Sequence, residues 1–282
     1  MTRGAVLVTG ASSGIGAAIA RELVTRAFSV FGTIRRPDDA AALAAAGVVP
    51  LRMDVTDAGG IAAARVEVER ALGGRPLVGL VNNAGIPAAG PLELVPLADL
   101  RRVLEVNLVG AVAVSQAFLP MLKLSRGRIV NISSVAGLAA MPFLGPYAAS
   151  KFALEAVSDS LRRELSPFGV GVIVIEPGII ESKMWDKAET IDLAPYRGTP
   201  YEKVLERFRN RALGRGRRAP PATLVARAVF RALTARRPPT RVLVSARPWI
   251  DGLVVRLPDT ILDWLVKRTV WRGEAGRGKR EG

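Results

Sequence analysis

Short apolar runs alternate with longer amphipathic stretches over most of the chain. Seven of the runs have the length of buried strands, and they cover residues 4–9, 28–34, 48–53, 77–82, 128–132, 170–175 and 241–245. The stretches between them repeat apolar residues at helical spacing. Strands that alternate with helices are typical of an α/β fold. The pattern therefore predicts a doubly wound, seven-stranded parallel sheet flanked by helices.

A glycine-rich turn follows the first apolar run. Gly10, Gly14 and Gly16 lie between that run and the first helical stretch. Gly10 allows a tight turn, while Gly14 and Gly16 let the backbone approach a pyrophosphate at the helix N-terminus. The spacing G-x-x-x-G-x-G differs from the common G-x-G-x-x-G fingerprint, and a glycine loop without a ligand is the alternative. The strand–turn–helix context favours a dinucleotide site.

The end of the second apolar run indicates which dinucleotide binds. Arg35 and Arg36 follow that run, and no acidic residue appears before Asp38. A carboxylate here would bind the ribose 2′-hydroxyl of NAD(H), whereas an arginine can neutralise the 2′-phosphate of NADP(H). The sequence therefore favours NADP(H), with NAD(H) as the alternative. The arginines could also simply lie on a solvated edge.

The composition limits the chemistry, because the 282 residues include no histidine and no cysteine. Histidine-based catalysis, thiol nucleophiles and disulfides are excluded, and no metal site is predicted. Tyr147 and Lys151, four residues apart, can place a phenol and an ammonium on one helix face. The ammonium, together with a nicotinamide ring, would lower the tyrosine pKa from about 10. Lys151 can also hold ribose hydroxyls, and the hydroxyl of Ser134 can fix a substrate oxygen.

The order of these motifs resembles the short-chain dehydrogenase/reductase superfamily, which has a Rossmann-type fold, from about residue 4 to about residue 245. The resemblance rests on the turn 9–16, Asp54-Val55, the segment 82–85, Asn107, Ser134, Tyr147 with Lys151, and Pro177-Gly178 followed by Ser182. It implies an oxidoreductase that acts on CH–OH donors with a nicotinamide dinucleotide. It also implies that Tyr147 is the general acid/base, Ser134 stabilises the substrate oxygen and Lys151 tunes the tyrosine. Asn107 would hold a water molecule of a proton relay.

The resemblance also implies a cofactor site built from the glycine turn, the strand ends and the late Pro-Gly segment. Its residues are Gly10, Ser12, Ser13, Gly14, Ile15, Gly16, Arg35, Arg36, Asp54, Val55, Asn83, Ala84, Gly85, Tyr147, Lys151, Pro177, Gly178, Ile180 and Ser182. Ser133 is the alternative to Ser134, Asn107 could instead cap or bridge backbone in a helix, and the Pro-Gly turn could be structural only. We expect Asn82 to be a scaffold residue that ties neighbouring strands.

Two positions depart from the family pattern. Ala27 stands where a helix-end glycine is expected, and Ser182 stands where threonine is common. The alanine is a mild change, and the serine hydroxyl can make the same hydrogen bond as threonine. Neither departure alters the predicted fold or activity.

Apolar residues near the predicted site indicate the substrate class. We expect the segment 181–216 to form a lid, and it carries Met184, Trp185, Ile191, Leu193, Tyr196 and Tyr201. Residues 141–144 add apolar groups, although they could equally be core or dimer-contact residues. Residues 176–185 are similar to the branch of retinol and 17β-hydroxysteroid dehydrogenases. We expect a lipophilic alcohol or ketone of steroid, retinoid or fatty type. A 3-oxoacyl thioester substrate and a non-catalytic, dinucleotide-sensing protein are the alternatives.

Positive charge is concentrated in the C-terminal third. The net charge is +15, and residues 197–282 hold 21 basic and 7 acidic residues, a balance of +14. Residues 247–272 combine tryptophans with basic residues, which predicts an amphipathic extension that contacts a membrane surface, a second subunit or the substrate pocket. No nucleic-acid-binding module accompanies the charge, so we expect no nucleic acid partner.

The chain is expected to have three parts: a Rossmann-type domain over 1–246, the extension over 247–272 and a disordered tail over 273–282. The resemblance implies a homodimer or homotetramer formed through the helices that bear Asn107 and Tyr147. No leader is visible, and no apolar run approaches the length of about 18 residues that a membrane span needs. We therefore expect a cytoplasmic protein, peripheral at a membrane surface if the extension binds lipid.

Overall fold

A single parallel sheet confirms the prediction from the apolar runs. The computed structural model of the chain describes residues 3–182 and 192–271. The strands are hydrogen-bonded in the order β3-β2-β1-β4-β5-β6-β7, so the winding reverses between β1 and β4. Their bounds are β1 (Ala5–Val8), β2 (Ser29–Ile34), β3 (Val49–Arg52), β4 (Leu77–Asn82), β5 (Arg128–Ile132), β6 (Gly171–Pro177) and β7 (Arg241–Val244).

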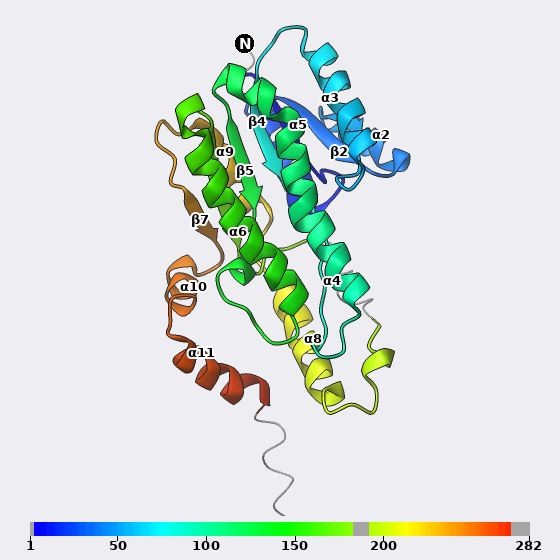
Figure 1. Cartoon of the computed structure of the whole chain (residues 1–282), viewed down its shortest axis with the longest axis vertical. Coiled ribbons are helices and arrows are strands. Elements are labelled where there is room, and N and C mark those ends of the chain that lie inside the picture. The colour runs from blue at the N-terminus through cyan, green and yellow to red at the C-terminus, as the bar shows by residue number, and fades with distance from the viewer. Residues whose placement is uncertain (1–2, 183–191, 272–282) are drawn as a thin grey trace, which may run out of the picture.

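Helices cover both faces of the sheet (Figure 1). One face carries α1 (Gly14–Thr25), α2 (Ala40–Ala45) and α9 (Thr223–Thr234), and the other carries α3 (Ala58–Leu72), α5 (Gly110–Ser125) and α6 (Gly145–Leu165). A π-helical stretch, Glu105–Val109, joins α4 (Leu97–Leu104) to α5. Helix α8 (Glu202–Gly216) precedes α9, and α10 (Pro248–Val254) and α11 (Asp259–Val266) follow β7.

Alternate residues of each strand supply two cores, one on either side of the sheet. In β1, Val6 and Val8 pack with α1 and α9, whereas Ala5 and Leu7 pack with α3 and α5. All four side chains are almost completely buried. Because helices cover both faces, the central strands have no polar side, and they therefore appear in the sequence as continuous apolar runs.

One helical segment of the described residues, 97–125, is long and apolar enough to cross a membrane, judged by length and composition alone. The sequence had led us to expect no segment of this length and apolarity. Val114, Phe118 and Leu122 on this segment are fully buried in the core beside the sheet. The burial of such large apolar side chains stabilises a packed α/β domain. This face of the segment therefore belongs to the core of the fold, although only 33% of its most apolar window is buried.

Buried asparagines tie the central strands to the helices in front of them. Asn82 Nδ2 donates to Asn131 Oδ1 at 2.8 Å and to Ser115 Oγ at 2.9 Å, and Asn131 Nδ2 donates to Ser158 Oγ at 2.8 Å. These bonds connect β4 and β5 with α5 and α6. They confirm the prediction that Asn82 is a scaffold residue.

The predicted lid contains helix α8 in the part that the structure describes, residues 181–182 and 192–216. Residues 183–191, which include Met184, Trp185 and Ile191, lie outside the described residues, as does the predicted tail 273–282. Helix α8 buries Val204 and Leu205 in a small apolar cluster with Phe143 and Tyr196. Phe143 is therefore a core residue of this cluster, which was one of the two alternatives for residues 141–144.

The end of the C-terminal extension folds back on the same cluster. The ring centroid of Trp271 lies 6.1 Å from that of Phe143, and Val270 also packs there. Arg211 Nη1 on α8 donates to the carbonyl oxygen of Thr269 at 2.8 Å. The final turn of the extension therefore contacts α8, while α10 and α11 extend away from the body of the molecule (Figure 1).

The turn between α1 and β2 holds an alanine in the left-handed backbone conformation. Ala27 has φ 63°, at the position where the family pattern has glycine. An L-residue in this region costs roughly 1 kcal/mol because its Cβ crowds the following carbonyl oxygen. The replacement of the usual glycine therefore introduces a small local strain.

We expect Ala27→Gly to raise the free energy of unfolding by about 0.5 kcal/mol, because relief of strain outweighs the added freedom of the unfolded chain. Urea denaturation followed by circular dichroism measures the change. Ala63→Gly, at an exposed position within α3, is the control and should lower the free energy of unfolding by about 1 kcal/mol. A destabilised Ala27→Gly variant would show that the left-handed alanine is not strained.

Candidate active site

A cleft of about 220 Å³ opens at the carboxyl ends of the central strands. Every residue predicted for the site lines this cleft except Arg36 and Asn107. In open parallel sheets, this edge at the reversal of strand order is where ligands bind. A second cavity of similar volume, beside Tyr196 and Arg209, contains none of the motif residues. The motifs therefore meet at one place in the fold.

The glycine turn has the geometry that a pyrophosphate needs. Gly10 and Gly14 have φ 65° and 55°, in the region that favours glycine. A Cβ at Gly16 would overlap the carbonyl oxygen of Gly10 and the amide of Asn83. Ser13, the N-cap residue of α1, makes no side-chain capping bond, so its hydroxyl does not compete for the first-turn N–H groups at the cleft. This arrangement fits a phosphate group at the helix N-terminus.

Asn83 holds the glycine turn in place. Its Nδ2 donates to the carbonyl oxygens of Thr9 at 2.9 Å and Gly10 at 3.2 Å. The hydroxyl of Thr9 accepts from the backbone N–H groups of Asn83 and Ala84, both at 2.9 Å. The segment after β4 and the segment after β1 therefore form one rigid floor of the cleft.

The two arginines after β2 have different positions. Arg35 lines the cleft, and its charge, together with hydrogen bonds from Thr56, lowers the pKa of Asp54 against the opposing effect of burial. The side chain of Arg36 is 74% exposed, does not line the cleft and lies 4.0 Å from Asp39 in an ion pair. Arg36 therefore lies at the solvated edge beside the cleft, and its place in the cofactor site stays a prediction.

Three polar side chains, one just after β5 and two on α6, meet beside the predicted nicotinamide position. Ser134 and Tyr147 are hydrogen-bonded through their side chains. Lys151 is buried, its Nζ donates to the carbonyl oxygen of Ile132 at 2.9 Å, and it lies 5.7 Å from the centroid of the Tyr147 ring. Ser133, the alternative serine, has a buried hydroxyl with no hydrogen-bond partner among the described residues. Contact with the tyrosine therefore favours Ser134.

Burial disfavours charge on both the tyrosine and the lysine. Burial raises the pKa of Tyr147, and the hydrogen bond with Ser134 opposes this rise. Burial also lowers the pKa of Lys151 to about 8, and the negative charge of Glu155 opposes this fall. Lys151 alone therefore does not produce the expected lowering of the tyrosine pKa, because the cost of burying a phenolate is larger.

Asn107 lies outside the cleft and bridges backbone and side-chain groups. Its Oδ1 accepts from the N–H of Ile86 at 2.8 Å, and its Nδ2 donates to the carbonyl oxygen of Ile86 and to Ser150 Oγ, both at 3.0 Å. The side chain thus anchors a loop of the cleft to α6, whereas the alternative for Asn107 had expected bonds to backbone in a helix. Its role in a water relay stays a prediction.

The Pro-Gly segment closes the cleft from the side of β6. The carbonyl oxygen of Pro177 lies 3.4 Å from Ser134 Oγ, and the N–H of Gly178 donates to the carbonyl oxygen of Val244 on β7. Ile180 and Ser182 line the cleft beyond this turn. The segment therefore supports the serine as well as lining the cofactor side.

Sequence reasoning missed several residues that line the cleft: Thr33, Ile34, Met53, Ile86, Pro87, Val106 and Ile132. Most are apolar and carry no motif. Thr33 is an exception, because its Oγ1 accepts from the N–H of Gly10 at 3.0 Å and so shapes the glycine turn. Their common signal is position, since most of them stand at or just beyond a strand end.

Known proteins share both the sequence and the fold. Residues 4–192 match the family described as short chain dehydrogenase. An NADPH-dependent 3-dehydrocapnine reductase from Ornithobacterium rhinotracheale is 35% identical over 91% of this chain and 94% of its own. Human retinol dehydrogenase 5 is 34% identical, with 93% of this chain and 89% of its own covered. A short-chain dehydrogenase from Streptomyces avermitilis, 29% identical, superposes with a TM-score of 0.75 over 97% of this chain and 99% of its own.

These matches define the class of protein. The chain belongs to the short-chain dehydrogenase/reductase superfamily and is an oxidoreductase. Within the superfamily it falls in the branch of retinol and 17β-hydroxysteroid dehydrogenases, as residues 176–185 predicted.

Proposed function

We propose that the protein is an NADP(H)-dependent oxidoreductase that interconverts a lipophilic alcohol and its carbonyl compound. The observation that carries the proposal is the meeting of Tyr147, Ser134 and Lys151 in the same cleft as the glycine turn. A dinucleotide-binding protein without turnover would need the turn but not the tyrosine. The three side chains therefore favour an enzyme over a sensor.

The chain's own residues provide for movement of a proton. Bound NADP(H) would supply the hydride donor or acceptor. Tyr147 gives its phenolic proton to the substrate oxygen in reduction and takes it back in oxidation. The Ser134 hydroxyl, already bonded to that phenol, is placed to hold the same substrate oxygen. The Lys151 ammonium favours the phenolate that remains after proton transfer.

Apolar surroundings support a lipophilic substrate. Ile86, Pro87 and Ile180 line the cleft, and Leu92, 64% exposed, lies beside Gly145 at the start of α6. The human relative is named for an alcohol, retinol. A 3-oxoacyl thioester is the competing substrate. NADPH oxidation, followed optically with apolar ketones and with 3-oxoacyl thioesters, separates the two classes.

We expect Tyr147→Phe to reduce turnover by at least about 10²-fold, because the ring remains but the exchangeable proton is lost. NADPH binding, measured by fluorescence titration, should stay within about twofold, since the glycine turn is untouched. Tyr201→Phe is the control, because the Tyr201 hydroxyl donates to Glu93 at 2.7 Å, away from the cleft residues. Wild-type turnover in Tyr147→Phe would refute the proposed chemistry.

We expect Arg35→Ala to weaken NADPH binding about tenfold and to leave NADH binding nearly unchanged, because only NADPH carries the 2′-phosphate. Isothermal titration calorimetry measures both affinities. Arg36→Ala is the matched control. Arg36 is the next residue in the chain and also carries a positive charge, but its side chain pairs with Asp39 and does not line the cleft. Equal losses of NADPH affinity in the two variants would contradict the assignment of Arg35.

We also propose that the C-terminal extension contacts an anionic lipid surface. Helices α10 and α11 expose Trp249 at 74%, Leu253 at 63% and Trp264 at 54%. Arg268 lies 4.8 Å from the Trp264 ring, and the last third of the chain is strongly basic. Exposed tryptophans beside basic residues suit the interface of an anionic membrane. The dimer or tetramer that the family resemblance implies would form through the helices that bear Asn107 and Tyr147, and Val109 and Phe152 are exposed there.

We expect Trp249→Ser combined with Trp264→Ser to reduce co-sedimentation with anionic phospholipid vesicles about tenfold. These substitutions leave Trp271 against Phe143, whereas truncation would remove that contact. Leu124→Ser is the control, because Leu124 is 89% exposed but lies on α5. Undiminished vesicle binding by the double variant would contradict the proposal. The proposal would also be contradicted if the wild type formed a concentration-dependent dimer that the double variant alone lost, because the tryptophans would then contact a second subunit.

A further inference from the structure

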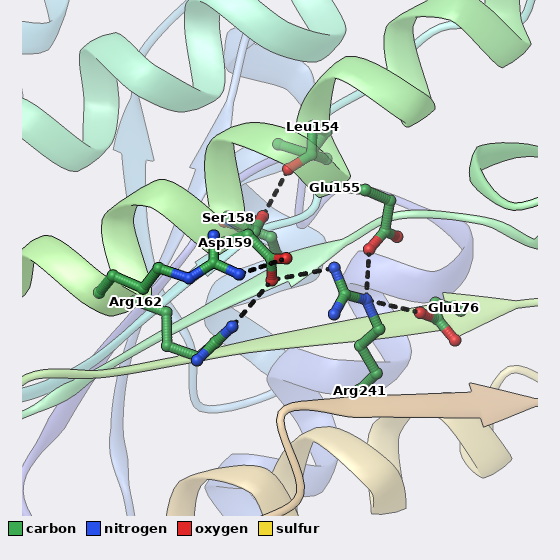
Figure 2. Close-up of polar contacts among 9 residues, drawn as sticks. Leu154, Glu155, Ser158, Asp159, Arg162, Glu176 and Arg241 are labelled. Atoms are coloured by element: carbon green, nitrogen blue, oxygen red, sulfur yellow. Dashed lines mark hydrogen bonds and ion pairs between the residues drawn. The ribbon is translucent and has the colours of Figure 1, made fainter. Parts of the chain in front are cut away.

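Three carboxylates of the described residues meet one guanidinium behind Lys151. Arg241, at the start of β7, places Nε 3.0 Å from Glu155 Oε2 and 3.5 Å from Glu176 Oε1, and Nη2 3.0 Å from Asp159 Oδ1. Glu155 and Asp159 lie on α6, and Glu176 lies on β6. Figure 2 shows the arginine side chain between the helix and the strand, with the carboxylates turned towards it.

Two of these carboxylates are poorly satisfied. Glu155 and Glu176 are only 6% and 4% exposed, and Oε1 of each has no hydrogen-bond partner among the described residues. Asp159 differs, because Arg162 at 3.2 Å and Arg163 at 3.4 Å also contact it. Glu155 and Glu176 therefore approach the same nitrogen atom, Nε of Arg241, from two sides.

Such a pair is stable when it holds one proton. Two buried negative charges at one guanidinium repel each other, and each loses hydration. One proton held by the pair removes the repulsion between the two charges. The proton belongs mainly on Glu176, since Glu155 makes the shorter contact with Arg241.

The other charged groups around the pair agree with this placement. Burial, and then the charge of Glu155, raises the pKa of Glu176 to about 7, while the charges of Arg241 and Arg256 oppose the rise. On α6, the charges that face the pair are Lys151 on one side and Asp159, with its own two arginines, on the other. Glu176 therefore titrates in the range where the enzyme is expected to work.

Glu155 connects the pair to the active site. It stands one helical turn after Lys151 on α6, and its negative charge supports the buried ammonium. We propose that Glu155 and Glu176 form a proton-sharing acid pair, clamped by Arg241, that positions Lys151 and keeps it charged. This role rests on the proposed function, in which the ammonium favours the tyrosine phenolate. Both glutamates are positioning residues, because they act through Lys151.

The first test is the pH profile of kcat/KM for carbonyl reduction with NADPH. Glu155→Gln removes the charge that supports the ammonium, so the alkaline limb should move about one pH unit lower. Glu155→Asp keeps a carboxylate and should restore the wild-type limb. Asp159→Asn is the matched control, since Asp159 contacts the same arginine one turn further from Lys151, and its profile should not move.

Two outcomes of this test overturn the proposal. One is an unmoved profile in Glu155→Gln. The other is an equal shift in Glu155→Gln and Asp159→Asn, which would show that only the attachment of Arg241 matters. A KM change without a change in the pH profile counts as an unmoved profile.

The second test needs no turnover, so it remains decisive if the proposed activity is wrong. The pKa of Glu176 is about 7 in the folded chain and 4.5 as its ordinary value, so folding takes up a proton between these values. The stability that this group contributes is therefore present below about pH 4.5 and is lost as the pH rises through about 7. As the pH rises from about 5 to about 8, the Tm of the wild type should fall relative to the Tm of Glu176→Gln. A constant Tm difference between the two proteins overturns the shared proton.

Discussion

A positive charge buried beside a tyrosine is the constraint on which the rest of the structure depends. Lys151 is 5% exposed, and the carbonyl oxygen of Ile132 accepts a hydrogen bond from its ammonium. A buried charge is costly unless it is paired and hydrogen-bonded. The end of β5 supplies the acceptor, and Glu155 supplies the opposite charge. The position of α6 along the sheet must therefore stay fixed, so that Lys151 remains at the end of β5.

The fold maintains this alignment through a frame of short polar contacts. Asn131 on β5 bonds to Ser158 on α6, and Asn107 ties the loop at Ile86 to Ser150 on the same helix. The glycine turn is fixed in a similar way by Asn83. Residues that are far apart in the chain therefore form one rigid unit, and the reactive groups need little rearrangement to meet a substrate.

Sequence patterns predicted the strands well because both faces of the sheet are covered, which leaves each strand continuously apolar. They also located the glycine turn, Ser134, Tyr147 and Lys151, whose chemistry requires particular residue types at particular spacings. They could not decide between the cleft and the solvated edge for Arg36, and they did not give the direction of the Tyr147 pKa, which depends on burial. The grouping of Glu155 with Arg241 was also hidden, since 86 positions separate them.

The contact between Trp271 and Phe143 determines where the end of the extension lies relative to the catalytic domain. It fixes the last turn of the extension to the apolar cluster that includes the loop before Tyr147. A bilayer that held the exposed tryptophans would therefore lie on the side of the molecule that carries this cluster. A lipophilic substrate dissolved in the acyl chains of the bilayer could then enter the enzyme directly from the membrane, without passing through bulk water. The rate would follow the amount of substrate per area of lipid and not its aqueous concentration.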